Sequence, residues 1–190
     1  MATKDKIKWD KKYKENPVLL QDRDVSKKLK YIVNDIQDKN ALDIACGTGR
    51  NSIYLANFGF DVEALDISEV AINSLEEKKI PNITTKLIDL EGFVPEKNSY
   101  DLIVMANYLD REIIPHLSLA LKQNGVLFIE TYMEHEDNTK PNSNPAFLLK
   151  KDELKTYFND EYKILEYEEF DNESYELYRM KKQYITVIKL

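Results

Sequence analysis

Apolar residues follow two spacings along the chain, one typical of buried strands and the other typical of amphipathic helices. Short apolar runs that are bounded by polar or turn residues predict the strands. The expected strands are residues 41–45, 61–67, 83–90, 100–108, 125–132, 162–170 and 179–190. The pattern therefore predicts a protein built around a sheet of seven strands.

Between the strands, apolar residues recur at every third or fourth position, which is the spacing of a helix. Ser68 is expected to cap one helix at its start, and Asn124 with Gly125 to stop another at its end. A polar loop is expected at about 134–145. The expected helices are residues 23–38, 50–58, the segment that follows Ser68, 113–121 and 152–158.

The order of these elements predicts the fold class. A helix comes first, strands then alternate with helices, and the last two strands follow each other without a helix. Alternation implies parallel strands with helices on both faces of the sheet. The short connection after residue 170 allows only a hairpin. We therefore expect an α/β, doubly wound, Rossmann-like seven-stranded sheet that is mostly parallel, with one antiparallel strand near the edge.

Composition adds limits on size, location and partners. The chain has 190 residues, which fits a single domain over 1–190, and no apolar run is long enough for a membrane span. The net charge of -7 argues against a nucleic-acid partner. Its start is too charged for a signal peptide, and the single cysteine excludes an internal disulfide. We expect a cytoplasmic protein without a membrane partner.

Polar residues gather where the expected strands end, which is where open parallel sheets bind their ligands. Asp66 ends the second strand, where a carboxylate can accept hydrogen bonds from the two hydroxyls of a ribose. The alternative role of Asp66 is to start the next helix. Asp89 can accept from an adenine amino group, or serve only in a turn. The other polar strand ends are Asp43 with the turn Gly47–Gly49, Asn107 with Tyr108, and Glu130 with Tyr132.

The glycine turn helps to choose between two cofactors that contain adenosine. A dinucleotide site requires the pattern G-x-G-x-x-G. Here the third glycine is replaced by Ser52, and Asp43 would have no role toward a nicotinamide. An acid in front of the turn can instead bind the ammonium group of a ligand with a free amino-acid tail, such as S-adenosylmethionine.

Taken together, Asp43–Gly49, Asp66 and Ile88–Leu90 resemble the successive signatures of class I S-adenosylmethionine-dependent methyltransferases. The final antiparallel pair of strands is also similar to that family. Ala45 departs from the pattern, since the family usually has glycine there. The resemblance covers nearly the whole chain.

The resemblance implies a role for each matching residue. Asp43 would organise the methionine end, while Gly47 and Gly49 would let the backbone lie against it. Asp66 would hold the ribose. Asp89 and the backbone of Leu90 would hold the adenine, and a carbonyl of Asn107 would lie beside the methionine moiety. The implied cofactor-binding set is Trp9, Tyr13, Asp43, Ala45, Cys46, Gly47, Asp66, Ile67, Asp89, Leu90 and Asn107.

Trp9 and Tyr13 belong to a run, Trp-Asp-Lys-Lys-Tyr, that is similar to an element of small-molecule methyltransferases of the tellurite-resistance and thiol-methylating type. In that group an N-terminal helix covers the cofactor. An aromatic lid excludes water and faces the sulfonium cation. The alternative is that both rings pack on the core. The resemblance divides the chain into a helical lid (1–38), a cofactor-binding core (39–133), and a substrate-side loop with terminal strands (134–190).

The acceptor side offers four catalytic candidates, which are Tyr108, Arg111, Glu130 and Tyr132. Arg111 can fix an anionic substrate, or lie on a helix surface. Cys46 is expected to fill space rather than act as a nucleophile, and no metal site is expected. Segments around these residues resemble one compact subgroup of these methyltransferases. This chain has Asp110 where that subgroup has a histidine, and Tyr132 where it has a phenylalanine.

The function expected from these features is S-adenosylmethionine-dependent methyl transfer, by in-line displacement, to a small-molecule acceptor. A thiol, a metalloid oxyanion and a small acid all remain open as acceptors, and the protein is expected to be a monomer or a homodimer. One alternative is a non-catalytic protein that binds S-adenosylmethionine, and a less favoured one is a dinucleotide oxidoreductase.

Overall fold

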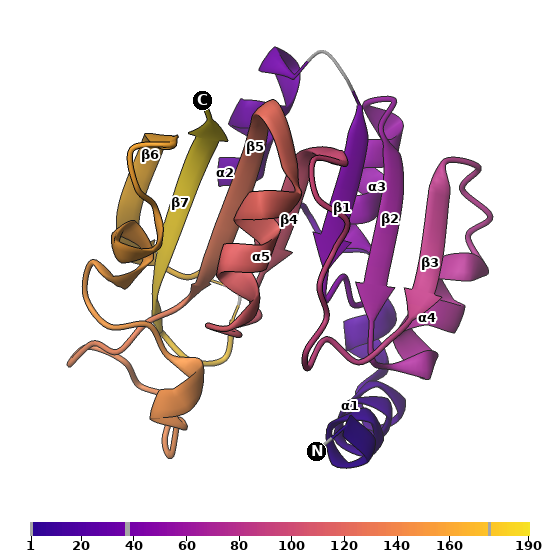
Figure 1. Ribbon diagram of the computed structural model, residues 1–190. Helices are drawn as coiled ribbons and strands as arrows, with labels where there is room; N and C mark the ends of the chain where they lie inside the picture. Colours follow the sequence, from indigo (N-terminus) through magenta and orange to yellow (C-terminus); the bar gives the residue numbers. More distant parts are fainter. Residues whose placement is uncertain (1, 37–38, 175) are drawn as a thin grey trace.

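The computed structural model describes residues 2–36, 39–174 and 176–190. A seven-stranded sheet runs through it in the order β3-β2-β1-β4-β5-β7-β6 (Figure 1). The strands are β1 (Asn40–Ile44), β2 (Asp61–Asp66), β3 (Ile83–Leu87), β4 (Tyr100–Ala106), β5 (Leu121–Tyr132), β6 (Tyr162–Asp171) and β7 (Lys181–Lys189). Each expected strand is therefore present, with shifts at its ends.

The helices are α1 (Ala2–Glu15), α2 (Lys27–Ile32), α3 (Arg50–Asn57), α4 (Glu69–Glu76) and α5 (Ile113–Ala120), with four 3₁₀ turns, η1 (Pro17–Leu20), η2 (Val33–Asp35), η3 (Pro145–Phe147) and η4 (Glu153–Tyr157). The helix expected over 23–38 is thus shorter. It begins after Ser26, whose hydroxyl accepts a hydrogen bond from Lys28 N, and it continues as η2. Residues 37–38 of this expected helix and of the expected lid lie outside the described residues.

β7 is the strand that runs against the others. It pairs antiparallel with both β5 and β6, whereas β1 to β5 pair parallel with one another. β7 lies second from the edge of the sheet. The prediction of a mostly parallel sheet with one antiparallel strand near the edge is confirmed.

Apolar side chains pack on both faces of the sheet. Leu102 and Val104 of β4 join a cluster with residues of α2 and α3, including Leu29 and Leu55. Ile103, the residue between them, joins a second cluster with α5. Because successive side chains of a strand point to opposite faces, β4 feeds both clusters. This packing fixes the ends of the strands relative to one another.

Asn124 and Gly125 do not end a helix, so that prediction is wrong. α5 ends at Ala120, and both residues lie inside β5. The pairing of β4 with β5 shifts register just after Tyr100, and a Cβ on Gly125 would lie 2.9 Å from Lys122 O. Asn124 and Gly125 therefore accommodate an irregularity in β5, where Asn124 adopts a positive φ of 63°.

Two smaller predictions have mixed outcomes. Ser68 caps α4 as expected, because its hydroxyl accepts a hydrogen bond from Ala71 N at 3.3 Å. The segment 152–158 forms the 3₁₀ turn η4 rather than an α-helix. The connection between β6 and β7 is a hairpin, as its length requires.

Candidate functional site

The carboxyl ends of β1, β2 and β4 meet at one edge of the sheet, and α1 lies across this edge beside β2 and α4 (Figure 1). The turn from β1 to α3 contains three residues with positive φ, which are Ala45 (54°), Gly47 (57°) and Gly49 (82°). This conformation costs an L-residue about 1–2 kcal/mol but costs glycine little. Ala45 is therefore strained at the position where the family that the sequence resembles usually has glycine.

The two glycines of the turn are required by the protein itself. A Cβ on Gly47 would lie 2.8 Å from the hydroxyl oxygen of Tyr13, and a Cβ on Gly49 would lie 2.5 Å from Leu75 Cδ1. A larger residue at either position would have to adopt a positive φ and displace the Tyr13 or Leu75 side chain. The turn is consequently a close contact among β1, α1 and α4.

Asp66 ties this turn to the next one. Its Oδ2 accepts a hydrogen bond from Gly47 N at 2.7 Å, and its Oδ1 accepts from Ser68 N at 2.8 Å. Burial raises the pKa of Asp66 above its ordinary value, although these backbone donors oppose the shift. A carboxylate has about four lone-pair sites, so this one keeps the capacity to accept two hydroxyl hydrogen bonds. The helix-starting and ribose-binding roles of Asp66 are compatible.

Asp43 is fully enclosed behind the turn. Ser52 donates its hydroxyl hydrogen bond to Asp43 Oδ2 at 2.5 Å, while Asp43 Oδ1 is buried and has no hydrogen-bond partner. Burial raises the pKa of Asp43 from its ordinary 3.8 to about 6, against the opposing effects of Ser52 and Arg50. A buried acceptor without a donor is rare in proteins, and a water, an ion or a ligand group can supply the missing partner.

Two further polar atoms, in the residues that follow the glycine turn, are also buried without a partner. They are Arg50 Nη2 and Asn51 Oδ1. Arg50 and Asn51 are the first two residues of α3, directly after the glycine turn. The charge of Arg50 acts to lower the pKa of both Asp43 and Tyr132, although burial dominates both shifts. Its guanidinium therefore lies within electrostatic reach of β1 and β5. We did not anticipate either residue from the sequence, where the only signal is their position after the turn.

The remaining cofactor candidates line the ends of β2, β3 and β4. Asp89 is half-buried and accepts a hydrogen bond from Glu91 N at 3.1 Å, while Leu90 is buried and Ile67 half-buried. Asn107 adopts a positive φ of 57°, and its N donates to Glu130 O at 2.7 Å. Cys46 is buried, which raises the pKa of its thiol and suits a space-filling role.

The aromatic residues of α1 face the same edge. Tyr13 is buried with its hydroxyl beside Gly47, and the ring of Trp9 lies 6.1 Å from the ring of Tyr13. Lys8 Nζ lies 5.9 Å from the ring centroid of Phe147, which belongs to η3. α1 thus lies between the glycine turn and the segment that follows β5.

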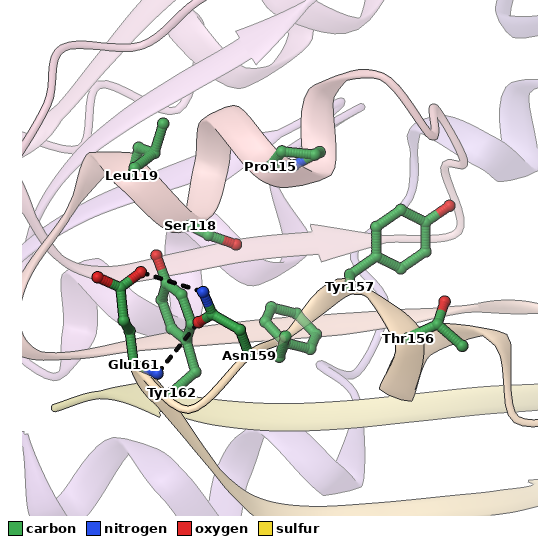
Figure 2. A pocket seen from close by; sticks show the side chains of 9 residues that line it. Pro115, Ser118, Leu119, Thr156, Tyr157, Asn159, Glu161 and Tyr162 are labelled. Atoms are coloured by element: carbon green, nitrogen blue, oxygen red, sulfur yellow. Dashed lines mark hydrogen bonds between the residues drawn. The ribbon is translucent and has the colours of Figure 1, made fainter.

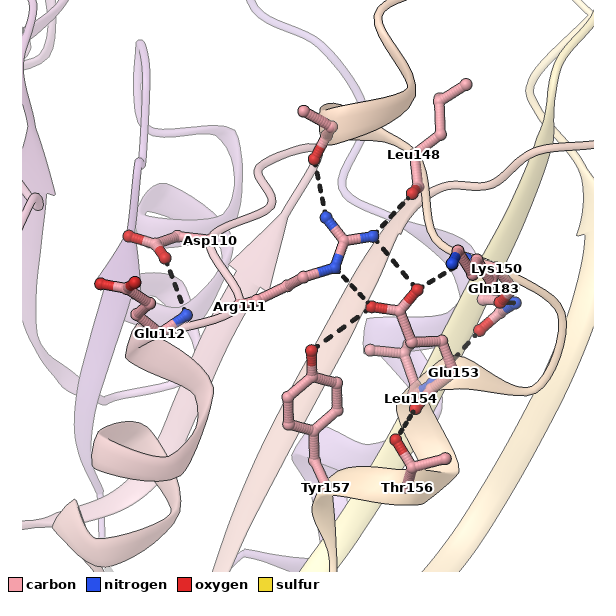
Figure 3. A network of polar contacts seen from close by, with 11 residues as sticks. Asp110, Arg111, Glu112, Leu148, Lys150, Glu153, Leu154, Thr156, Tyr157 and Gln183 are labelled. Atoms are coloured by element: carbon pink, nitrogen blue, oxygen red, sulfur yellow. Dashed lines mark hydrogen bonds and ion pairs between the residues drawn. The ribbon is translucent and has the colours of Figure 1, made fainter.

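Arg111 supports the chain rather than facing an acceptor (Figure 3). Its Nε lies 2.7 Å from Glu153 Oε1, and its Nη2 lies 3.1 Å from Glu153 Oε2. Nη1 and Nη2 also donate to the carbonyls of Ala146 and Leu148, at 2.7 and 2.8 Å. With these partners, the guanidinium clamps η3 to η4. These contacts engage the guanidinium, for which the sequence left open either fixing an anionic substrate or lying on a helix surface.

Glu130 is likewise enclosed. Its side chain is fully buried, accepts a hydrogen bond from Ser26 Oγ at 2.5 Å, and lies 3.3 Å from Lys182 Nζ. Lys182 is also fully buried and pairs with Glu173 at 3.0 Å. This ion network joins β5 to α2 and to the β6–β7 connection. The side chain of Glu130, one of the four catalytic candidates, is therefore engaged by structural partners.

Tyr108 and Tyr132 remain as polar groups on the acceptor side. Burial raises the pKa of both phenols well above the ordinary value, with further contributions from Asp110 at Tyr108 and from Glu176 at Tyr132. The Tyr132 hydroxyl donates to Glu176 Oε2 at 2.8 Å. Both side chains are consequently neutral hydrogen-bonding groups at physiological pH, and neither is a strong base.

A separate pocket of about 310 Å³ lies between α5 and the segment 156–162 (Figure 2). None of the site residues expected from the sequence lines it. Within the described residues, no group of three or more His, Cys, Asp or Glu side chains is placed to hold a metal ion. No helix in the same residues has the length and apolar character that crossing a bilayer requires.

The strand order and the polar carboxyl edge define the fold of the class I methyltransferases. The structure is similar to TehB from Haemophilus influenzae, with a TM-score of 0.76 and 28% identity over 87% of this chain and 63% of that one. It also shares the fold of magnesium protoporphyrin IX methyltransferase from Synechocystis, at a TM-score of 0.72 and 16% identity, with 100% and 99% of the two chains covered.

Sequence comparison gives the family. The model of the family described as Tellurite resistance protein TehB matches residues 1–188, so the chain belongs to the TehB family. A probable S-adenosyl-L-methionine-dependent methyltransferase TehB of Haemophilus influenzae is 36% identical over 138 residues, 67% of this chain and 47% of that protein. A ubiquinone biosynthesis O-methyltransferase of Coxiella burnetii is 31% identical over 55% of this chain and 49% of that protein. The chain spans about half the length of these curated relatives.

Proposed function

We propose that this chain is a methyltransferase that uses S-adenosylmethionine and acts on a small-molecule acceptor by in-line displacement. The observation that carries the proposal is the set of three unpartnered buried polar atoms beside the glycine turn, which are Asp43 Oδ1, Arg50 Nη2 and Asn51 Oδ1. Two acceptors and one cationic donor complement an ammonium and a carboxylate. These are the two groups at the amino-acid end of S-adenosylmethionine, so the residues fit this cofactor.

The other cofactor contacts follow from the positions of the strand ends. Asp66 has free lone pairs for the ribose hydroxyls, and Asp89 with Leu90 lies at the next strand end, where adenine is expected. Tyr13 and Trp9 would close the site from α1. When bound, the cofactor supplies a methyl group that is already activated by positive sulfur. The names of the relatives support this assignment.

The chain contributes positioning and exclusion of water rather than strong base catalysis. Holding two reactants in line removes much of the entropic barrier to a bimolecular reaction. Tyr108 and Tyr132 keep their protons, so they can orient an acceptor by hydrogen bonds but cannot deprotonate it readily. With Glu130 and Arg111 engaged elsewhere, the site favours an acceptor that is already deprotonated in solution. A metalloid oxyanion and a small carboxylate meet this condition, and a thiol, with an ordinary pKa of about 8.5, is ionised in part.

A methyl-transfer assay with S-adenosylmethionine labelled in the methyl group tests the proposal. The acceptors are one thiol, selenite or tellurite as the oxyanion, and one small carboxylate. We expect the labelled methyl group to appear on an acceptor of one of these three classes. The Asp66→Ala variant should lose this transfer. Cofactor binding without transfer to any acceptor would instead support a non-catalytic binding protein, which the engagement of Arg111 and Glu130 favours as the alternative.

The proposal extends to the organisation of the protein. We interpret the two apolar clusters as the two helical layers of a doubly wound sheet within a single domain, with 1–38 as the lid and 134–190 on the acceptor side. The net charge of -7 and the single cysteine support a cytoplasmic protein that does not bind nucleic acid. A monomer and a homodimer are both compatible with this function.

A further inference from the structure

α1 buries a narrow stripe that combines two charged and two aromatic side chains. Among its described side chains, only Lys6, Trp9, Asp10 and Tyr13 are buried or half-buried, and they recur at the spacing of one helix face. A helix of 14 residues is marginal in water by itself, so α1 depends on the contacts of this stripe. Trp9 and Tyr13 supply the apolar part of this contact, and Lys6 and Asp10 supply its polar part.

Asp10 makes the central contact of the stripe. Its Oδ1 accepts hydrogen bonds from Ser68 Oγ at 2.7 Å and from Val70 N at 3.3 Å, at the amino end of α4. Lys6 Nζ lies 3.0 Å from Asp10 Oδ2 and 2.9 Å from Glu69 Oε2. A carboxylate at a helix amino end is also favoured by the helix dipole. Burial opposes the charge of Asp10, but the hydrogen bonds of Ser68 and Lys6 hold the pKa of Asp10 below its ordinary value.

The same contacts continue into the cofactor site. Ser68, which donates its hydroxyl to Asp10, donates its backbone N–H to Asp66 Oδ1. The other oxygen of Asp66 accepts from Gly47 N. One turn along α1 from Asp10, the hydroxyl of Tyr13 lies against Gly47. A closed circuit of contacts therefore joins α1, the start of α4 and the glycine turn.

We propose that Asp10 is the latch that holds α1 over the cofactor site, and that it is a positioning residue for cofactor binding. Asp10 contacts the start of α4 and not the turn where the cofactor would lie. It fixes Tyr13 against Gly47, and it fixes Ser68 so that Asp66 points toward the ribose position. The proposal rests on the function proposed above, because it assigns α1 the role of a lid on that cofactor.

Two variants and one control separate this role from a general loss of stability. Asp10→Ala removes the acceptor for Ser68 and Val70, whereas Asp10→Asn keeps an acceptor oxygen for them but loses the charge and the oxygen that pairs with Lys6. Glu15→Ala removes an equally charged, exposed residue of the same helix. By calorimetry with S-adenosylhomocysteine, we expect binding to weaken about 10-fold in Asp10→Ala, as the loss of one to two hydrogen bonds predicts. Asp10→Asn should stay within about 3-fold of the wild type, and Glu15→Ala should be unchanged.

Hydrogen exchange of the ligand-free protein tests the latch without the cofactor. We expect the amides of α1 to exchange faster in Asp10→Ala than in the wild type, while those of β4 and β5 keep their protection. Unchanged exchange in α1, or unchanged affinity in Asp10→Ala, would overturn the proposal. So would equal weakening in Glu15→Ala. If the wild type binds no S-adenosylhomocysteine, the proposed function is wrong, and α1 exchange alone then decides whether Asp10 is a latch.

Discussion

Asp43 offers the sharpest test of the electrostatics of the site. Its pKa rises from 3.8 to about 6 because the carboxylate is fully buried, so the charged form destabilises the folded protein. Between these two pKa values the folded state binds more protons than the unfolded state. The free energy of unfolding contributed by Asp43 therefore increases as the pH falls. For these values the gain is about 1.4 kcal/mol from pH 8 to pH 5, and about 3 kcal/mol once the pH falls below both pKa values.

Asp43→Asn removes this pH dependence. We expect the stability of the variant relative to the wild type to be greater at pH 8 than at pH 5 by about 1.4 kcal/mol. Urea unfolding of both proteins at each pH measures the difference, and the comparison cancels the titration of the groups that do not interact with Asp43. Ser52→Ala is the matched control, because it removes the hydrogen bond to Asp43 but leaves the buried charge. A difference that is the same at pH 8 and pH 5 would refute the reasoning.

Three other substitutions test the structural assignments, each by urea unfolding at pH 7.5. Arg111→Ala should lower the free energy of unfolding by about 1–2 kcal/mol, because η3 is released from Glu153. The affinity for S-adenosylhomocysteine should stay unchanged. Arg111→Lys should not restore the lost stability, because lysine lacks the planar fork of the guanidinium. Lys182→Met should lower the free energy of unfolding by about 3–5 kcal/mol, since buried carboxylates lose their cation. Adding Glu130→Gln to this variant should restore part of the lost stability. Ala45→Gly should stabilise the fold by about 0.5–1 kcal/mol by relieving the positive φ. A stabilising Lys182→Met, or a destabilising Ala45→Gly, would contradict these assignments.

The sheet could be predicted from the sequence because its strands are short apolar runs separated by clear turn and capping signals. Ser68 is one such signal, and the structure bears it out. Asn124 and Gly125 show the limit of this reasoning. The same pair of residues suits a helix end and a strand irregularity, because both need a positive φ or a missing side chain. Only the pairing partner on β4 decides between them.

The candidate site was predictable in position but less so in the roles of its residues. Asp43 and Asp66 follow from the ends of strands, which local sequence marks. The engagement of Arg111 by Glu153, and of Glu130 by Lys182, joins residues that are distant in the chain. The residues near each side chain in the sequence therefore give no sign of its charge partner.

Asp10 illustrates the same limit on α1. The alternating charges at the start of the chain are typical of a solvated helix face, and most of these side chains are exposed. Asp10 differs only because α4 begins beside it, with Ser68 and Val70 as donors. The partner again comes from a distant part of the sequence.

The central claim is that the carboxyl edge of the sheet binds S-adenosylmethionine through Asp66. Isothermal titration of S-adenosylmethionine into the wild type and into Asp66→Ala tests it most directly. Two hydrogen bonds to a charged acceptor predict that the substitution weakens binding by about 100-fold or more. Absence of binding to the wild type, or equal affinity in the two proteins, would contradict the account.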